Sequence, residues 1–169
     1  MYLFFIIAAF LIIVFLFIDR EQLKDYYPTI QYYIICNLLY NFVFYHHTLW
    51  RYEGETAWLK HSIIEITFTF IVVPIMIIVY LRFFPSDLKG LAYLAAWALS
   101  FWITEVIFNK KGNFIYENGW NIWWSFLFNL IMFPILIIHY KRPIVAIIIS
   151  IPLILLLLLF FHPALKDLK

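Results

Sequence analysis

Long uninterrupted apolar segments constrain this chain more than any other feature. The sequence holds six of them, each 17 to 20 residues long and separated by short polar breaks. A bilayer core of about 30 Å needs roughly 17–25 apolar residues per helix. Backbone groups in lipid must be satisfied within the segment, so these segments are expected to be helices. The sequence therefore predicts an all-α, polytopic membrane bundle, with one transmembrane domain over residues 1–169 and six spans at residues 2–18, 29–45, 62–81, 91–108, 122–140 and 144–161.

The composition agrees with a lipid-embedded chain. Hydrophobic residues make up 66% of it and charged residues only 13%, whereas soluble domains have about 45–50% and about 25%. Residues 2–18 lack a basic stretch before them and an A-x-A-like site after them. We therefore interpret this segment as a retained helix and not as a cleaved signal peptide.

Several function classes find no support in the sequence. The net charge of +2 gives no indication of a nucleic-acid partner. The single cysteine, Cys36, excludes an intramolecular disulfide. With four glycines and no CxxC, HExxH or GxSxG motif, the chain offers no recognisable phosphate, redox or hydrolase site. No cofactor is expected, and a non-enzymatic role is favoured over an enzyme.

A local similarity indicates an internal duplication. Ile71–Arg82 ("IVVPIMIIVYLR") aligns with Ile131–Arg142 ("IMFPILIIHYKR") at an offset of 60. Chance matching of aliphatic residues is the alternative, but a proline, a tyrosine and an arginine also match. We predict that the hairpin of helices 2–3 and the hairpin of helices 4–5 are parallel repeats, as found in transporters. Pro74 and Pro134 would kink their helices.

The basic residues leave the membrane orientation tied. The loops after the first, third and fifth helices carry six lysines and arginines, and the remaining loops with the carboxyl terminus also carry six. "DREQLK" follows the first helix, whereas only the amino terminus precedes it. We therefore expect loops 1, 3 and 5 in the cytoplasm and both termini outside.

Polar residues recur at helical spacing in the four central helices. Residues four apart lie on one face of a helix. The first and sixth helices are almost entirely aliphatic and are expected to face lipid. The stripes are Asn37 and Asn41 in the second helix, His61, Glu65 and Thr69 in the third, Ser100, Thr104 and Glu105 in the fourth, and Asn121, Ser125 and Asn129 in the fifth.

These stripes are expected to converge on the membrane face of loops 2 and 4, where two helices end and two begin. Glu65 and Glu105 would lie within about two turns of that face. Ionisable residues in spans usually face the bundle interior and mark a site, and two neighbouring carboxylates form a protonatable pair. We predict a polar cavity open toward loops 2 and 4, with the candidate ligand-binding residues Glu65, Glu105, His61, Asn37, Asn41, Asn121, Asn129 and Trp124.

Structural roles compete for the same residues. Glu105 lies near a helix end, where its carboxylate could reach the interface or pair with Lys110 or Lys111. Asn37 and Asn129 could simply hydrogen-bond neighbouring helices. In that case the polar stripes hold the bundle together and bind no ligand.

The histidines and tryptophans also have two interpretations. His61 and Glu65 could hold an ion together with His46 or His47, but no tight ligand spacing supports this, and no metal is predicted. His139 is expected at the opposite interface. Tryptophans around loops 2 and 4 are typical of a headgroup-level belt, or they form lids that stack on a cationic ligand; these are Trp50, Trp58, Trp120, Trp123 and Trp124.

Three stretches carry a resemblance to a known family. "YYPTIQYYIICNLLYNF" (26–42), "TEVIF" (104–108) and "NGWNIWWSFLFNLIMFPILIIHYKRP" (118–143) resemble an uncharacterised family of small multi-pass membrane proteins from spore-forming Gram-positive bacteria. The resemblance covers most of the chain. It implies a bacterial plasma membrane and no particular chemistry.

A second resemblance concerns chemistry. His61, Glu65, Glu105 and the pair Asn121 and Trp124 are similar in type and order to the site of the emopamil-binding sterol isomerases. Here the Asn-x-x-Trp follows Glu105 without an intervening helix. The resemblance implies Glu65 and Glu105 as the proton-transfer pair, with His61 beside them.

Three functions follow as hypotheses. The chain binds or transports a small cationic or polar solute or protons; or it is a structural or interaction protein with no small-molecule site; or it is a membrane enzyme acting on lipid by acid–base chemistry. The lipid bilayer is the one expected partner in all three, and the oligomeric state is not readable from the sequence.

Overall fold

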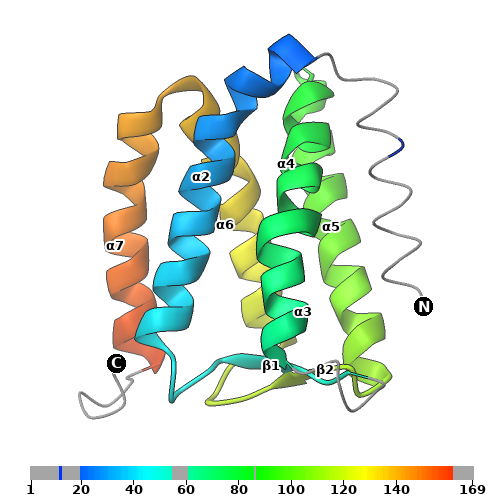
Figure 1. Cartoon of the computed structure of the whole chain (residues 1–169), viewed down its shortest axis with the longest axis vertical. Helices are drawn as coiled ribbons and strands as arrows, with labels where there is room; N and C mark the ends of the chain where they lie inside the picture. The colour runs from blue at the N-terminus through cyan, green and yellow to red at the C-terminus, as the bar shows by residue number, and fades with distance from the viewer. Residues whose placement is uncertain (1–11, 13–19, 55–60, 86, 162–169) are drawn as a thin grey trace.

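The computed structural model describes residue 12 and residues 20–54, 61–85 and 87–161. This part of the chain forms a bundle of long helices that run up and down alongside one another, with a small two-stranded sheet across one end (Figure 1). The elements are α2 (Arg20–Val43), β1 (Trp50–Tyr52), α3 (His61–Thr67), the π-helical segment η1 (Phe68–Val72), α4 (Val73–Arg82), α5 (Lys89–Lys110), β2 (Phe114–Tyr116), α6 (Ile122–Lys141) and α7 (Pro143–Phe161).

Four helices in the described part of the chain are long and apolar enough to cross a membrane. They are His61–Arg82, which runs continuously through α3, η1 and α4, and the helices α5, α6 and α7. They match the last four predicted spans, so the helical class is confirmed, and the length and composition of these four helices are consistent with a membrane protein. The six-span count is not confirmed: residues 29–45 fall mainly in α2, which lacks the required hydropathy, and residues 2–18 lie outside the described residues except for Ile12.

The outer surface of the bundle is apolar as well as its core, and several polar side chains are buried. Large aliphatic side chains such as Ile144 (73% exposed) and Ile148 (61% exposed) point outward. Polar side chains such as Asn129 (5% exposed) and His139 (4% exposed) are buried between helices. Burying polar groups while exposing apolar ones is favourable only where the surroundings are hydrocarbon.

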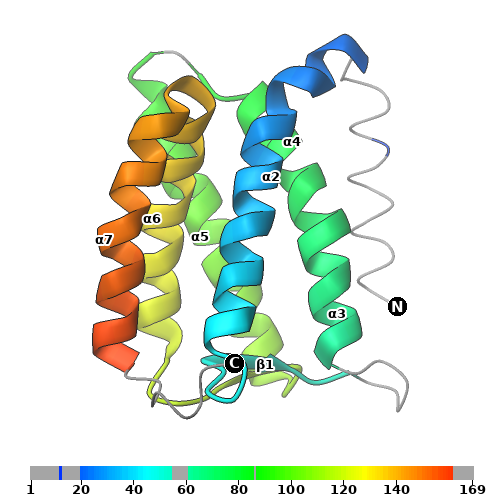
Figure 2. The same ribbon diagram turned by 60° about the vertical axis from the view of Figure 1, so that its left-hand side comes forward.

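Helix α6 is the centre of the bundle, because it packs against α2, α4, α5 and α7. Figure 2 shows α2 standing between α7 on one side and α3 on the other, as in Figure 1. The main core forms where α4, α5 and α6 meet. Tyr80 and Phe133 are both 0% exposed there, and the Tyr80 hydroxyl donates to the Phe133 carbonyl at 2.9 Å.

The π-helical segment η1 ends two residues before Pro74, the second residue of α4. Proline has no N–H to donate and its ring crowds the carbonyl four residues back, so the turn widens there. Pro134, its predicted counterpart, lies within α6, which remains a continuous α-helix. Tyr80 is fully buried and the aligned Tyr140 is 37% exposed. The structure therefore does not support the predicted repeat.

The strands β1 and β2 form an antiparallel pair that the sequence analysis did not anticipate. Trp50 pairs with Tyr116, and Tyr52 pairs with Phe114. The Glu117 amide donates to the Leu49 carbonyl at 2.8 Å beyond the pair. This ribbon joins loops 2 and 4 beneath the bundle, beside the first residues of α3 and the last residues of α5 (Figure 1).

Candidate functional site

Four predicted or neighbouring polar side chains meet between α2 and the α3–η1 helix, and we call them the Glu65 cluster: Glu65, Asn37, Asn41 and Thr69. The Asn37 amide donates to Glu65 Oε1 at 3.0 Å and to Thr69 Oγ1 at 2.6 Å. The Asn41 amide donates to the same Glu65 oxygen at 3.2 Å and to the Asn37 carbonyl at 3.0 Å. The helical spacing of the polar residues in both helices brings them together, as the stripes predicted.

The two oxygens of Glu65 differ in their surroundings. Oε1 accepts from two asparagine amides. Oε2 is buried and has no hydrogen-bond partner among the described residues. A buried carboxylate oxygen without a donor is destabilising. The cluster thus holds Glu65 Oε1 in place and leaves Oε2 able to accept a hydrogen bond from a ligand.

The strand β1 closes the Glu65 cluster on the side of loops 2 and 4. The Tyr52 amide donates to His61 Nδ1 at 3.1 Å, and the Tyr52 ring stacks on His61 and on Phe68. Burial, followed by the nearby negative charge of Glu65, raises the pKa of the Tyr52 phenol well above its usual range. His61 is therefore a contact of the ribbon, and Tyr52 is a site neighbour that the sequence analysis missed.

The second carboxylate lies in a separate cluster. Glu105 accepts a hydrogen bond from the Tyr116 hydroxyl at 2.7 Å, and the Ser125 hydroxyl also interacts with it. Ser125 in turn accepts from Trp120 Nε1 at 2.7 Å. This Glu105 cluster ties α5 to β2 and α6, which is a structural arrangement with satisfied partners.

Replacing Tyr116 with phenylalanine is expected to lower the stability by roughly 1–3 kcal/mol, because the Glu105 carboxylate loses a donor. Burial and, after it, the hydrogen bond to Glu105 raise the pKa of the Tyr116 phenol above its ordinary value. The stabilisation from the neutral phenol is therefore complete below about pH 10, the ordinary tyrosine pKa, and is lost as pH rises toward the folded-state value. The stability gap between the wild type and the variant should narrow above that pH.

Melting curves in lipid nanodiscs from pH 7 to pH 11 check this expectation. Tyr27→Phe is the matched control, because Tyr27 is 60% exposed and its change should stay within about 0.5 kcal/mol. A Tyr116→Phe protein as stable as the wild type at pH 7 would contradict the structural role of the Glu105 cluster.

The remaining predicted residues take other places. Asn121 caps α6, where its side chain accepts from the amides of Trp123 and Trp124. Asn129 is buried in α6. No three His, Cys, Asp or Glu side chains in the described ranges are grouped so as to hold a metal. The hypothetical metal set of His61, Glu65 and a histidine of loop 2 is thus not assembled.

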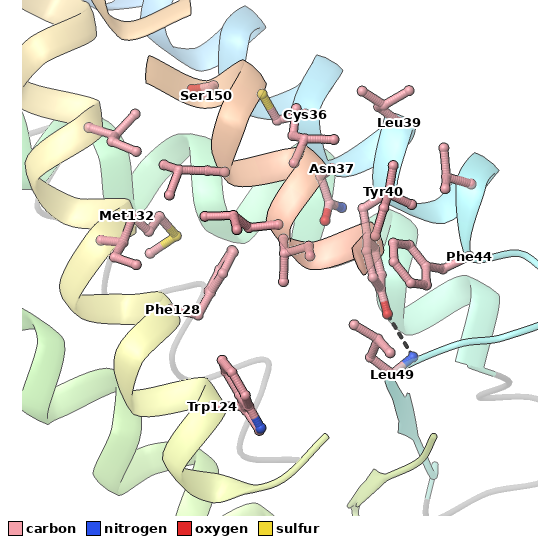
Figure 3. A pocket seen from close by; sticks show the side chains of 18 of the residues that line it. Cys36, Asn37, Leu39, Tyr40, Phe44, Leu49, Trp124, Phe128, Met132 and Ser150 are labelled. Carbon is pink, nitrogen blue, oxygen red and sulfur yellow. Dashed lines mark hydrogen bonds between the residues drawn. The ribbon is translucent and has the colours of Figure 1, made fainter. Parts of the chain in front are cut away.

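A cavity of about 310 Å³ lies elsewhere than the predicted polar cavity. It lies between α2, α6 and α7, and its wall is almost wholly apolar (Figure 3). Of the predicted site residues only Asn37 and Trp124 line it. The sixth predicted helix, α7, was expected to face only lipid. It forms one wall of the cavity, because it packs on α6 and part of the inner face of α7 remains uncovered.

A third polar group, missed by the sequence analysis, lies toward the opposite end of the bundle. The Thr29 hydroxyl hydrogen-bonds His139 Nδ1 at 3.0 Å, and the Tyr32 ring stacks on His139. The Tyr32 hydroxyl also hydrogen-bonds Ser150. His139 is therefore buried between helices in the last turn of α6, at the end of the bundle where the sequence placed it. Thr29 lies at the same four-residue spacing as Asn37 and Asn41. This spacing was the sequence signal that could have placed Thr29 on the polar face of α2.

The chain matches no protein-family model, no curated protein and no solved structure. The resemblances noted from the sequence therefore stay predictions, and the chemistry of the site rests on its own geometry.

Proposed function

We propose that the protein is a membrane-embedded binding protein whose Glu65 carboxylate receives the cationic group of a small solute. The observation that carries the proposal is the buried Glu65 Oε2, which has no hydrogen-bond partner within the described ranges while Oε1 is held by Asn37 and Asn41. An ammonium group would supply the missing donor and the opposite charge. A proton on the carboxylate is the smaller ligand of the same kind.

The contrast between the two glutamates supports binding over a purely structural role. The hypothesis of a purely structural protein predicts that both carboxylates are directly paired. Glu105 fits that expectation through Tyr116, whereas Glu65 leaves an oxygen open. Ionisable residues in membrane helices that are not fully paired mark ligand or ion sites.

The enzymatic alternative receives less support from the geometry. Acid–base chemistry on lipid would need Glu65 and Glu105 to act on one substrate. The two carboxylates belong to separate clusters with separate hydrogen-bond partners, and neither lines the cavity. The resemblance to sterol isomerases is therefore not the basis of the proposal.

The proposal includes a topology in which α2 also crosses the membrane, as do residues 2–18, within a bacterial plasma membrane. Helix α2 has 24 residues, so it is about 36 Å long. Its exposed face carries Ile35, Leu38 and Phe42, whereas Asn37 and Asn41 point toward Glu65 of α3. Such a helix crosses lipid as part of a bundle, although its mean hydropathy is low. Loops 1, 3 and 5 remain assigned to the cytoplasm.

Methylammonium binding tests the proposal. The melting temperature of the full chain in lipid nanodiscs should rise with methylammonium chloride for the wild type and for Glu105→Gln, but not for Glu65→Gln. Sodium chloride at the same concentration controls for ionic strength. A Glu65→Gln protein that responds as the wild type does would show that Glu65 does not receive the cation.

A further inference from the structure

The apolar cavity between α2, α6 and α7 has no role in the proposed function. None of its lining residues carries a charge, and most are aliphatic or aromatic. The polar groups in its wall are the side chains of Tyr32, Tyr33, Cys36, Asn37, Tyr40 and Ser150 and the indole N–H groups of Trp50, Trp120 and Trp124. An uncharged wall complements a neutral occupant, because burying a charge there without a partner is costly.

Side-chain contacts mark the two ends of the cavity. At one end the Tyr32 hydroxyl of α2 hydrogen-bonds Ser150 of α7. At the other end, near the β1–β2 ribbon, Trp120 and Phe161 pack with ring centroids 5.1 Å apart. Ser150 and Phe160 both line the cavity, and the helical rise over the ten steps from one to the other is about 15 Å. This length is half of the roughly 30 Å hydrocarbon core, so the cavity is as long as one leaflet.

The width of the cavity is also informative. A volume of about 310 Å³ spread over about 15 Å leaves about 5 Å across for the centre of a water molecule, and about 8 Å between the walls once a radius of about 1.4 Å is added on each side. A helix with its side chains is about 10–12 Å across, so a helix of a second copy does not fit. One extended hydrocarbon chain does.

The cavity is continuous with the lipid-facing surface. Leu39 of α2 (41% exposed) and Leu156 and Phe160 of α7 (47% and 61% exposed) line it and also face outward. A chain from the surrounding bilayer can therefore enter sideways between α2 and α7 without leaving the membrane. Figure 3 shows Phe44 and Trp124 near the ribbon end of the cavity and Ser150 near the other end.

We propose that this cavity binds one acyl chain of a membrane lipid from the leaflet on the side of the β1–β2 ribbon. The chain lies along α6 with its methyl end toward Ser150. Its headgroup stays at the ribbon face, where Trp50, Trp120 and Trp124 in the cavity wall provide indoles of the kind that anchor at headgroup level. Glu65 itself does not line this cavity, and the two sites share only Asn37, which donates to Glu65 Oε1 and lies in the cavity wall.

Native mass spectrometry of the full chain, released from detergent with added dioleoyl phosphatidylcholine, tests this proposal. Leu157→Trp fills the cavity from α7, and Leu155→Trp is the matched control, because Leu155 is 54% exposed and does not line it. We expect one retained lipid on the wild type and on Leu155→Trp, and at least a tenfold lower occupancy on Leu157→Trp. Leu157→Ala, which widens the cavity, should keep the lipid, so that a misfolded tryptophan variant does not decide the result.

Three results would overturn the proposal. The wild type releases from detergent without lipid; or Leu157→Trp and Leu155→Trp retain it equally; or the wild type is a dimer that Leu157→Trp converts to a monomer, which would assign the cavity to a second copy. Methylammonium binding to Leu157→Trp, measured alongside, should match the wild type. Loss of lipid with intact methylammonium binding separates this site from Glu65.

Discussion

Replacing Tyr80 with alanine is expected to lower the stability of the folded bundle by roughly 3–5 kcal/mol, the range for removing a fully buried aromatic side chain. The Tyr80 ring is 0% exposed and is stacked on Tyr93 at 5.7 Å and against Phe133 at 5.0 Å. Its hydroxyl donates to the Phe133 carbonyl, and the Tyr80 carbonyl accepts from the Tyr93 hydroxyl. The interior is close-packed, and lipid does not fill the cavity that alanine would leave. The loss of packing contacts therefore dominates the change in stability.

Unfolding by denaturing detergent in bicelles measures this effect. Tyr80→Phe keeps the ring and removes only the hydrogen bond, so it should be less stable than the wild type by about 1 kcal/mol. Tyr140→Ala is the matched control from the aligned position, because Tyr140 is 37% exposed and its main ring contact is Tyr26. Equal losses of stability in Tyr80→Ala and Tyr140→Ala would contradict the different environments of the two tyrosines and would favour the internal repeat.

Replacing Glu65 with glutamine is expected to make the bundle more stable, by about 1–2 kcal/mol. Glutamine keeps the shape and the Oε1 that accepts from Asn37 and Asn41, and it removes the buried charge whose other oxygen has no donor in the described part of the chain. Stabilisation on neutralising a residue is the pattern of a functional site that is held at a cost to stability.

The same change at Glu105 is expected to act in the opposite direction. Glu105 accepts from the Tyr116 hydroxyl, and a hydrogen bond to a charged group contributes about 1.5–3 kcal/mol. Glu105→Gln should therefore melt below the wild type when both are measured in nanodiscs at pH 7. If Glu65→Gln also melts lower by a similar amount, both carboxylates are structural and the cation site is withdrawn.

The helical spacing of polar residues was informative where the partners lie on adjacent helices. Asn37, Asn41 and Glu65 were grouped from their i, i+4 positions, and the structure brings them together. The same reasoning grouped Glu105 with Glu65, but Glu105 bonds to Tyr116 of a strand. That strand forms by pairing with a segment more than sixty residues away, and local periodicity carries no information on such a pairing.

What the sequence by itself determined is the solvent and the helices, because long apolar segments have only one way to satisfy their backbone in hydrocarbon. It also determined which face of α2 and α3 is polar, since a helix has a fixed period. The tertiary structure alone decided that, among the described residues, Glu65 keeps an unpartnered oxygen whereas Glu105 accepts from Tyr116, and that an apolar cavity lies between α2, α6 and α7. In lipid no hydrophobic force selects one helix neighbour over another, so neighbours follow from side-chain fit across the whole bundle, which the linear order of residues does not display.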